Sequence, residues 1–272
     1  MSAASHPIPV GLVGAGIFMR EAHISALTAS DSAFSIRAIY SRTEASAQAA
    51  AELVPNRVDV VTDLTMLLSR KDIDAVVIAL PIPQLPEAVR QALAAGKHVV
   101  SEKPIAPTVA AGRALVREYR AQVPHLTWMV GENWRYETAY VRAQELAAQG
   151  AIGRVRLGRS TVIAPVTPAS KYYATTWRRA GTFPGGFVLD GGVHHVAGLR
   201  ALLGEVESVS AAVMQLRDDL PPADTISATL RFASGALVAY QATYALDVAG
   251  EDGLLLIGDG GTLHIARGKL AL

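Results

Sequence analysis

The order of strand-like and helix-like segments in the first 125 residues constrains the fold more than any other feature of the sequence. The strand-like runs are continuous in valine and isoleucine, as expected for strands that are buried on both faces, and their alternation with helices predicts a doubly wound parallel sheet. The expected strands are residues 10–13, 36–40, 58–61, 75–80, 98–101 and 126–130. The expected helices are 21–29, 44–53, 64–68, 84–95 and 107–122, the fourth of them stopped by Gly96.

The pattern changes after residue 150. Strand-like runs then follow one another across short turns that contain glycine or aspartate, and short connections imply antiparallel neighbours. The expected strands are 154–163, 206–216, 225–232, 236–244, 253–257 and 262–266, with one helix over about 192–203 that ends at Gly204. The sequence therefore predicts an α/β domain over residues 1–130 and an α+β domain with a mainly antiparallel open sheet over residues 131–272.

The composition excludes several classes of protein. The chain has 272 residues, of which 18% are charged, and its formal net charge is +1. This balance indicates neither a nucleic-acid-binding protein nor one that is attracted to an anionic membrane. The absence of cysteine excludes disulfides, thiolate catalysis and sulfur-ligated metals.

Residues 1–7 do not read as a secretory leader, and no apolar run approaches the roughly 20 residues of a spanning helix. We therefore expect a cytoplasmic protein.

A pair of glycines follows the first expected strand. Gly14 and Gly16 occupy the positions where a backbone must turn tightly and approach a pyrophosphate, whose charge then rests on the N–H groups of a helix start at Ile17 and Phe18. The third glycine position of that pattern holds Met19, and we expect this side chain to move the helix outward without abolishing binding. The pair predicts a dinucleotide-binding turn, and a purely structural turn is the alternative.

The end of the second expected strand bears on the choice of cofactor. An NAD site usually has an acidic residue here for the ribose 2′-hydroxyl, whereas an arginine accommodates a 2′-phosphate. The strand runs into Ser41 and Arg42, with no acid before Glu44. A hydroxyl and a guanidinium favour NADP over NAD. The alternative is that Arg42 is an ordinary exposed loop residue.

The tripeptide Glu102-Lys103-Pro104 stands directly after the expected strand 98–101. Ligands bind at the carboxyl ends of the strands in open α/β sheets. The tripeptide therefore places a cationic side chain at the mouth of the predicted sheet. Taken alone, Lys103 is more simply explained as a surface lysine at a strand end.

A second constellation lies in the glycine-rich segment 185–195. Asp190 and His194 are four residues apart, so on a helix they would share one face. A carboxylate beside an imidazole can fix its tautomer and favour its protonated form. The simpler alternative is a helix cap together with a satisfied histidine. A metal site is not predicted, because no third ligand is evident.

Taken together, the Gly-x-Gly turn, Glu102-Lys103-Pro104 and the Asp-x-x-x-His of Asp190 and His194 resemble the Gfo/Idh/MocA oxidoreductase family. The resemblance covers the chain from Val10 to about Ala266. Segments 133–136 (Asn-Trp-Arg-Tyr) and 177–178 (Trp-Arg) are similar to the fungal-type NADP-linked branch of that family.

The resemblance implies a Rossmann domain followed by a mixed-sheet domain, with the substrate between them. Lys103 would orient the substrate hydroxyl or carbonyl and assist its proton transfer. His194 would be the general acid or base, and Asp190 would be its partner or a substrate ligand. The Lys103–Pro104 bond would be cis. Residues that would contact the cofactor are Gly14, Gly16, Ile17, Phe18, Ser41, Arg42, Leu80, Pro81, Glu102, Lys103 and Arg178.

Two departures from the family pattern are visible. Relatives commonly carry a histidine after the fourth strand, where this chain has Pro86. Relatives also continue for several tens of residues beyond the position of Leu272, which would leave the last sheet without an edge strand. Unpaired backbone groups invite pairing with another chain. We therefore expect either a shortened protein or fragment, or a partner that covers that edge. Separately, a sheet with one exposed apolar face favours a homodimer.

The leading functional hypothesis is an NADP-dependent dehydrogenase or reductase that acts on a sugar, a polyol or a related small hydroxy or carbonyl compound. A nucleotide-sensing regulator on the same fold is the alternative from another class, and an inactive truncated relative is the third. Several aromatic residues could stack on a sugar ring, although aromatic residues at this density more often serve ordinary packing. They are Trp134, Tyr136, Tyr172, Tyr173 and Trp177.

Overall fold

The computed structural model describes residues 6–248, 252–266 and 269–272. Residues 1–5, in which no secretory leader was expected, lie outside the described part. The chain forms two compact units, Met1–Gly131 (unit 1) and Glu132–Leu272 (unit 2). No helix among the described residues combines the length and the apolar character that a membrane span needs.

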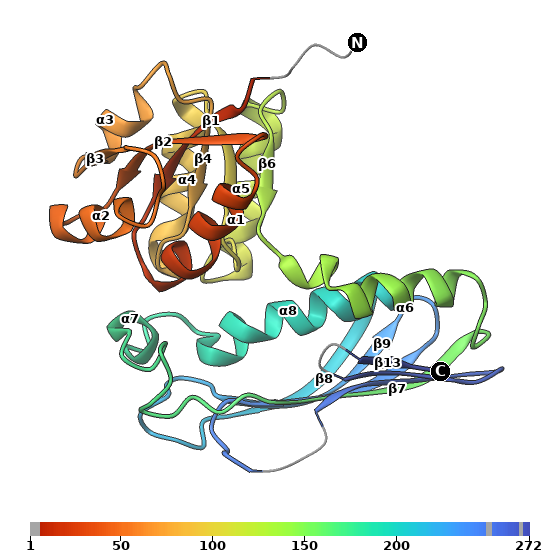
Figure 1. The fold of residues 1–272 in the computed structure, drawn as a ribbon. Coiled ribbons are helices and arrows are strands. Elements are labelled where there is room, and N and C mark those ends of the chain that lie inside the picture. The colour runs from red at the N-terminus through yellow and green to blue at the C-terminus, as the bar shows by residue number, and fades with distance from the viewer. Residues whose placement is uncertain (1–5, 249–251, 267–268) are drawn as a thin grey trace, which may run out of the picture. The chain divides into compact units, whose positions relative to one another are not determined.

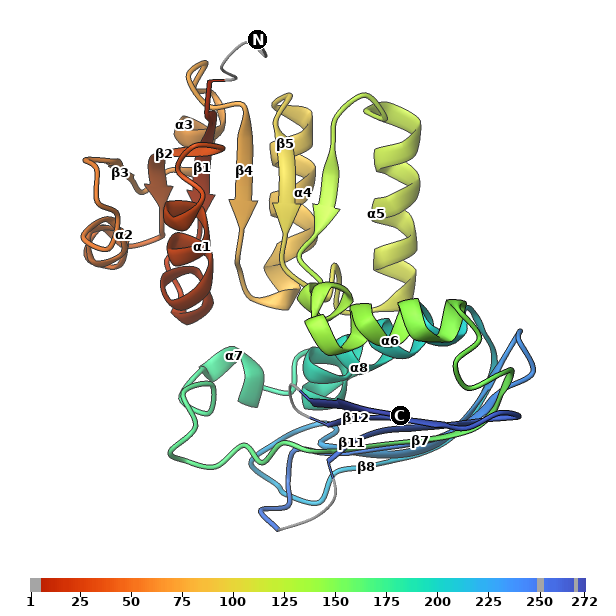
Figure 2. The same cartoon turned by 45° about the vertical axis from the view of Figure 1, so that its right-hand side comes forward.

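Unit 1 is built on a six-stranded sheet in which every neighbouring pair is parallel (Figure 2). The strand order is β3-β2-β1-β4-β5-β6, so the direction of winding reverses between β1 and β4. Such a reversal is the point at which open parallel sheets bind ligands. The strands are β1 (Ile8–Val13), β2 (Phe34–Tyr40), β3 (Asp59–Val61), β4 (Ala75–Ile78), β5 (His98–Ser101) and β6 (Trp128–Val130).

Helices cover both faces of this sheet. Successive strand residues point to opposite faces, so neighbouring residues of one strand pack against different helices. Leu12 packs in a cluster with residues of the first two helices, whereas its neighbour Val13 packs in a cluster with residues of the next three. Threonine and aspartate side chains cap three of the helix starts. The helical elements are η1 (a π-helix, Met19–His23), α1 (Ile24–Ala29), α2 (Glu44–Ala51), α3 (Leu64–Leu68), η2 (Ile82–Gln84), α4 (Leu85–Ala94) and α5 (Val109–Gln122).

Unit 2 contains a seven-stranded sheet in the order β13-β12-β11-β7-β10-β9-β8. Only the β7–β10 pair is parallel among its described neighbours, so the sheet is mainly antiparallel, as predicted. The strands are β7 (Val155–Ile163), β8 (Val206–Met214), β9 (Thr225–Phe232), β10 (Leu237–Thr243), β11 (Gly253–Gly258), β12 (Thr262–Ala266) and β13 (Lys269–Ala271). The short β13 was not among the predicted strands, and β8 ends two residues earlier than predicted.

Two long helices lie on the same face of the second sheet (Figures 1 and 2). They are α6 (Thr138–Ala148) and α8 (Gly186–Leu203), and the shorter η3 (Asn133–Tyr136) and α7 (Thr176–Arg179) complete the helical part of the unit. The core lies between these helices and the sheet and includes Phe187, Leu199, Val238 and Leu256. Buried and exposed residues alternate along β9 and β10, so the side chains on the opposite face of the sheet are exposed within this unit.

The expected helix over 192–203 begins six residues earlier than predicted, at Gly186. Glycine is a poor helix former, which is why the glycine-rich segment before residue 192 resembled a loop. Packing explains the difference. A Cβ atom on Gly191 would lie 2.0 Å from the hydroxyl oxygen of Tyr244, so the helix can approach the sheet here only with glycine.

Candidate functional site

The turn after β1 has the geometry that a dinucleotide-binding turn requires. Gly14 adopts φ = 102°, a conformation that side chains disfavour, and a Cβ atom on it would lie 2.4 Å from the carbonyl oxygen of Ala79. Gly16 differs, because a Cβ atom on it would meet no described atom within 4 Å. Protein packing therefore does not demand glycine at position 16, whereas close approach of a phosphate group would.

The helix that follows this turn accommodates Met19 in the core. Its side chain is fully buried in a cluster with Leu12, Ile24 and Ile39. The backbone N–H of Ile24 bonds to the carbonyl of Met19, five residues earlier, so the helix makes a wide π-type turn at this point. The third glycine position is thus filled by a core side chain.

Ser41 and Arg42 lie at the carboxyl end of β2, beside the glycine turn. The backbone of Gly14 donates to the carbonyl of Tyr40, which connects the two strand ends directly. Ser41 is half-buried and Arg42 is exposed, and no hydrogen bond or ion pair holds the Arg42 guanidinium among the described residues. Arg42 directly precedes Thr43, whose side chain caps helix α2. An uncommitted guanidinium next to a helix start suits an anionic group.

Glu102, Lys103 and Pro104 follow β5, and the Lys103–Pro104 peptide bond is cis, as the resemblance implies. The Glu102 side chain is only 11% exposed, and its Oε1 lies 2.8 Å from Nε2 of His23. This contact joins the strand end to the helix that follows the glycine turn. Lys103 is half-buried, and its backbone N–H donates to the carboxylate of Glu102.

Unit 1 therefore brings several of the predicted cofactor residues to the carboxyl edge of one sheet. The turn from Gly14 to Phe18, the Ser41-Arg42 pair and Glu102-Lys103 come from β1, β2 and β5. Leu80 and Pro81 were expected at the end of the fourth strand and the start of the following connection. The strand ends earlier, at Ile78, so both residues lie in the connection to η2. An open cradle at Gly16 with an exposed cation nearby fits a dinucleotide phosphate.

In unit 2, Asp190 is held by Arg178. The Nε of Arg178 donates to Oδ2 of Asp190 at 2.7 Å, and both side chains are less than one-fifth exposed. The guanidinium also lies over the rings of Trp177 and Tyr172, at 4.1 and 4.7 Å from their centroids. A guanidinium fixed in this way presents a planar group for hydrogen bonding.

His194 has a partner that sequence reasoning missed. Its Nδ1 lies 2.6 Å from Oε1 of Glu132, a residue 62 positions earlier in the chain. The spacing of four residues had indicated Asp190 as the carboxylate beside this imidazole. An available signal was the position of Glu132, directly before the Asn-Trp-Arg-Tyr segment that contributes to the resemblance.

The neighbouring His195 faces a different environment. Its ring is buried, and its Nδ1 lies 2.9 Å from the hydroxyl of Tyr240. Burial raises the pKa of Tyr240 above its ordinary range, so the phenol stays protonated. His195 is therefore a satisfied core histidine, whereas His194 is partly accessible.

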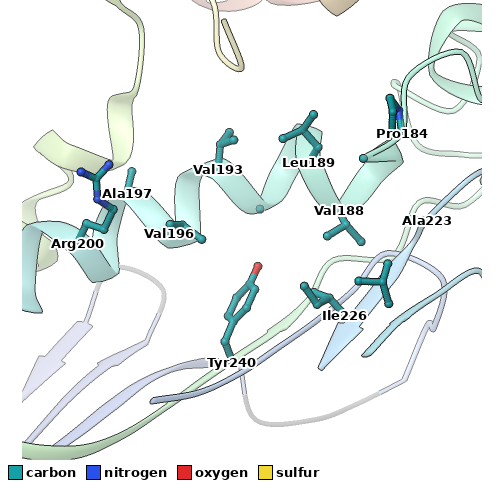
Figure 3. Close-up of a pocket in the computed structure, with 13 residues that line it drawn as sticks. Pro184, Val188, Leu189, Val193, Val196, Ala197, Arg200, Ala223, Ile226 and Tyr240 are labelled. Atoms are coloured by element: carbon teal, nitrogen blue, oxygen red, sulfur yellow. The ribbon is translucent and has the colours of Figure 1, made fainter. Parts of the chain in front are cut away.

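A cavity of about 570 Å³ lies between α8 and the sheet in unit 2. Val188, Val196 and Ile226 contribute apolar walls, and the Tyr240 hydroxyl points up toward the helix (Figure 3). None of the predicted site residues is among those that line it. Helix α8 thus separates two surfaces, because Val188 and Val196 lie on a different side of the helix from Asp190 and His194.

Of the aromatic residues that were candidates for a sugar-stacking wall, Tyr172 and Trp177 both lie against the Arg178 guanidinium, whereas the other three have separate surroundings. The Trp134 ring stacks on His194 at 5.9 Å between centroids, and the Tyr173 hydroxyl donates to Asp219. Tyr136 is 71% exposed. Across residues 6–248, 252–266 and 269–272, no group of three His, Asp or Glu side chains is arranged to hold a metal ion.

Comparison with known families assigns both parts of the chain. Residues 8–128 match the family described as an oxidoreductase family with an NAD-binding Rossmann fold, and residues 140–264 match the GFO/IDH/MocA C-terminal domain. Dehydrogenase FPY6 from Fusarium mangiferae is 38% identical over 82% of this chain and 67% of its own length. Across three curated relatives, the chain spans 64% to 67% of their length.

Solved structures agree with this assignment. An oxidoreductase (TM0312) from Thermotoga maritima superposes with a TM-score of 0.93 at 33% identity, over 98% of this chain and 81% of that one. The WlbA dehydrogenase from Bordetella pertussis, solved in complex with NADH and UDP-GlcNAcA, superposes with a TM-score of 0.86 at 27% identity. That superposition covers 95% of this chain and 77% of the other.

Proposed function

This chain belongs to the Gfo/Idh/MocA oxidoreductase family, and on that premise we propose that it transfers a hydride between NADP and a sugar, a polyol or a related small hydroxy or carbonyl compound. The observation that carries the proposal is the gathering of the glycine turn, Arg42 and Glu102-Lys103 at the carboxyl edge of one parallel sheet. The complex of the similar WlbA dehydrogenase with NADH and a sugar nucleotide supports the substrate class.

In the proposed reaction, a bound nicotinamide would supply the hydride chemistry, and the protein must position the substrate and manage one proton. The backbone N–H groups from Gly16 to Phe18 would hold the pyrophosphate. Ser41 and Arg42 would hold the 2′-phosphate that distinguishes NADP from NAD. Lys103 orients the substrate oxygen and assists its proton transfer, and His194 gives or takes the proton. Asp190 and Arg178 provide polar groups for further substrate or cofactor contacts.

Turnover measurements test these roles. With NADPH or NADP as cofactor and a panel of aldoses, polyols and diols, Lys103→Met and His194→Ala should each lower kcat by roughly 100- to 10,000-fold, because each removes a proton-handling group. Lys71→Met and His264→Ala are matched controls at exposed positions and should retain activity. Full turnover in both test variants would disprove the assigned roles. NADPH binding with no turnover of the unsubstituted chain would favour the nucleotide sensor instead.

We also propose a homodimer that forms through the open face of the second sheet. Leu157 and Ile257 are cross-strand neighbours on β7 and β11, and they are 51% and 39% exposed on that face. Adjacent exposed apolar side chains are typical of an interface. Sedimentation analysis should give twice the chain mass, and Leu157→Lys should shift it to the monomer. A monomeric unsubstituted chain would disprove the dimer.

A further inference from the structure

The surroundings of His194 assign different tasks to the two carboxylates near helix α8. Asp190 shares the helix with His194, but its carboxylate forms an ion pair with Arg178. Glu132 comes from the start of unit 2 and reaches Nδ1 of His194 at 2.6 Å. Its side chain is only 11% exposed, and that of His194 is 19% exposed, so water competes little for this contact.

The Glu132 carboxylate is itself held in place. Its Oε1, the atom that contacts His194, also accepts a hydrogen bond from the backbone N–H of Trp134 at 3.1 Å. This bond caps the short helix η3. The carboxylate therefore has a fixed direction before it meets the imidazole, and it does not depend on a flexible surface rotamer.

The imidazole is also held from its face. The indole of Trp134 stacks on the His194 ring, with an angle of 17° between the two planes. The same indole meets the His195 ring at 5.0 Å, edge to face. One short segment, Glu132 to Trp134, thus fixes both the position of Nδ1 and the plane of the ring.

A neutral imidazole carries its proton on one nitrogen only, and the nitrogen next to a carboxylate keeps it. We propose that Glu132 is the positioning residue of His194: its carboxylate accepts a hydrogen bond from Nδ1–H and so leaves Nε2 as the atom that exchanges a proton with the substrate. The inference rests on the proposed function for its catalytic meaning, but the tautomer itself does not. Asp190, paired with Arg178, is then assigned to contacts with the ligand and not to His194.

The tautomer is measured directly by ¹⁵N NMR of the imidazole nitrogens in the full-length chain, with the His194 signals identified by their loss in His194→Ala. The unsubstituted chain should show Nδ1 protonated and Nε2 unprotonated. In Glu132→Gln, the amide can donate as well as accept, so the tautomer preference should be lost. Glu137→Gln, which removes an exposed carboxylate from the same segment, is the matched control and should leave the tautomer unchanged.

Kinetics provide the second readout. Glu132→Gln should lower kcat roughly 100-fold or more, while KM and the Kd for NADPH change little, since the imidazole is lost as a base but not as a contact. Asp190→Asn should leave the tautomer as it is. A His194 that is protonated on Nε2 in the unsubstituted chain would overturn the inference, and so would a tautomer that responds to Asp190→Asn and not to Glu132→Gln. The expected tautomer without turnover on any substrate would leave the inference standing and refute the proposed function instead.

Discussion

At the scale of single residues, the hydrogen-bond partner decides what each polar group of the candidate site can do. Asp190 and Glu132 are both carboxylates with little exposure, yet one is neutralised by a guanidinium and the other is directed at an imidazole. Arg42 is the opposite case, because it is exposed and is not engaged by any described residue. Its role depends on what it would bind.

Arg42→Ala should weaken the binding of NADPH and leave that of NADH nearly unchanged. A hydrogen bond to a charged group contributes about 1.5–3 kcal/mol, so the Kd for NADPH should rise by about 10- to 100-fold. Fluorescence titration with both cofactors gives the ratio. Arg57→Ala removes another exposed arginine and serves as the control for charge alone. Equal losses for both cofactors would show that Arg42 does not recognise the phosphate.

Tyr244→Phe should stabilise the protein by roughly 1 kcal/mol. The Tyr244 hydroxyl is buried, and no described residue accepts or donates a hydrogen bond to it, so its removal relieves a desolvation cost. Tyr240→Phe is the matched comparison, because its hydroxyl bonds to His195, and it should destabilise by a similar amount. Urea unfolding measures both changes. A larger loss for Tyr244→Phe than for Tyr240→Phe would contradict this account.

At the scale of elements, helix α8 shows how packing overrides helix propensity. Its glycines lower the propensity of the segment, but they let the helix lie close to the tyrosines of the sheet beneath it. The helix also carries His194 and Asp190 on one side and lines an apolar cavity with another. The close approach of α8 to the sheet therefore sets where His194 and Asp190 lie.

Gly191→Ala isolates the packing effect. Helix propensity alone predicts a gain of about 1 kcal/mol, whereas the contact of the new methyl group with Tyr244 predicts a loss of roughly 1–3 kcal/mol through overpacking. We expect a net loss of stability, measured by thermal unfolding. Ala197→Gly in the same helix should cost about 1 kcal/mol from propensity. A stabilised Gly191→Ala variant would show that α8 does not need its close approach to the sheet.

At the scale of the whole molecule, each unit has its own core, and the core of unit 2 contains phenols. Burial raises the pKa of Tyr140 to about 12 and also raises those of Tyr240 and Tyr244 above the ordinary value of 10. In each case the folded state keeps a proton that the unfolded state loses above pH 10. The contribution of these tyrosines to the free energy of unfolding is therefore fully present below about pH 10 and is lost as the pH rises above it.

The expected slope is a loss of roughly 1.4 kcal/mol per pH unit for each such tyrosine above pH 10. Urea unfolding between pH 8 and pH 11 measures it. Tyr240→Phe should reduce the slope, because one titrating group is removed. Tyr172→Phe is the control, since that ring is not in the core cluster of unit 2. A flat stability profile up to pH 11 would show that these phenols are not shielded from water.

Local patterns predicted unit 1 well. Valine-rich runs separated by capped amphipathic helices indicate a parallel sheet, and the glycine pair indicates the turn at its edge, because each signal lies within a few adjacent residues. The same reasoning failed in unit 2 for the start of α8, since glycine there serves a contact with Tyr244, more than fifty residues away along the chain.

The sequence by itself determined the fold class, and it predicted the cofactor-binding edge and the polar residues of the candidate site apart from Glu132. Those features follow from periodicity, turn chemistry and strand order, which are local. Only the tertiary structure decided that His194 meets Glu132 and that Asp190 meets Arg178. Spacing and charge together favour Asp190 as the partner of His194, whereas Glu132 satisfies charge alone. The choice between the two carboxylates depends on how η3 and α7 pack against α8.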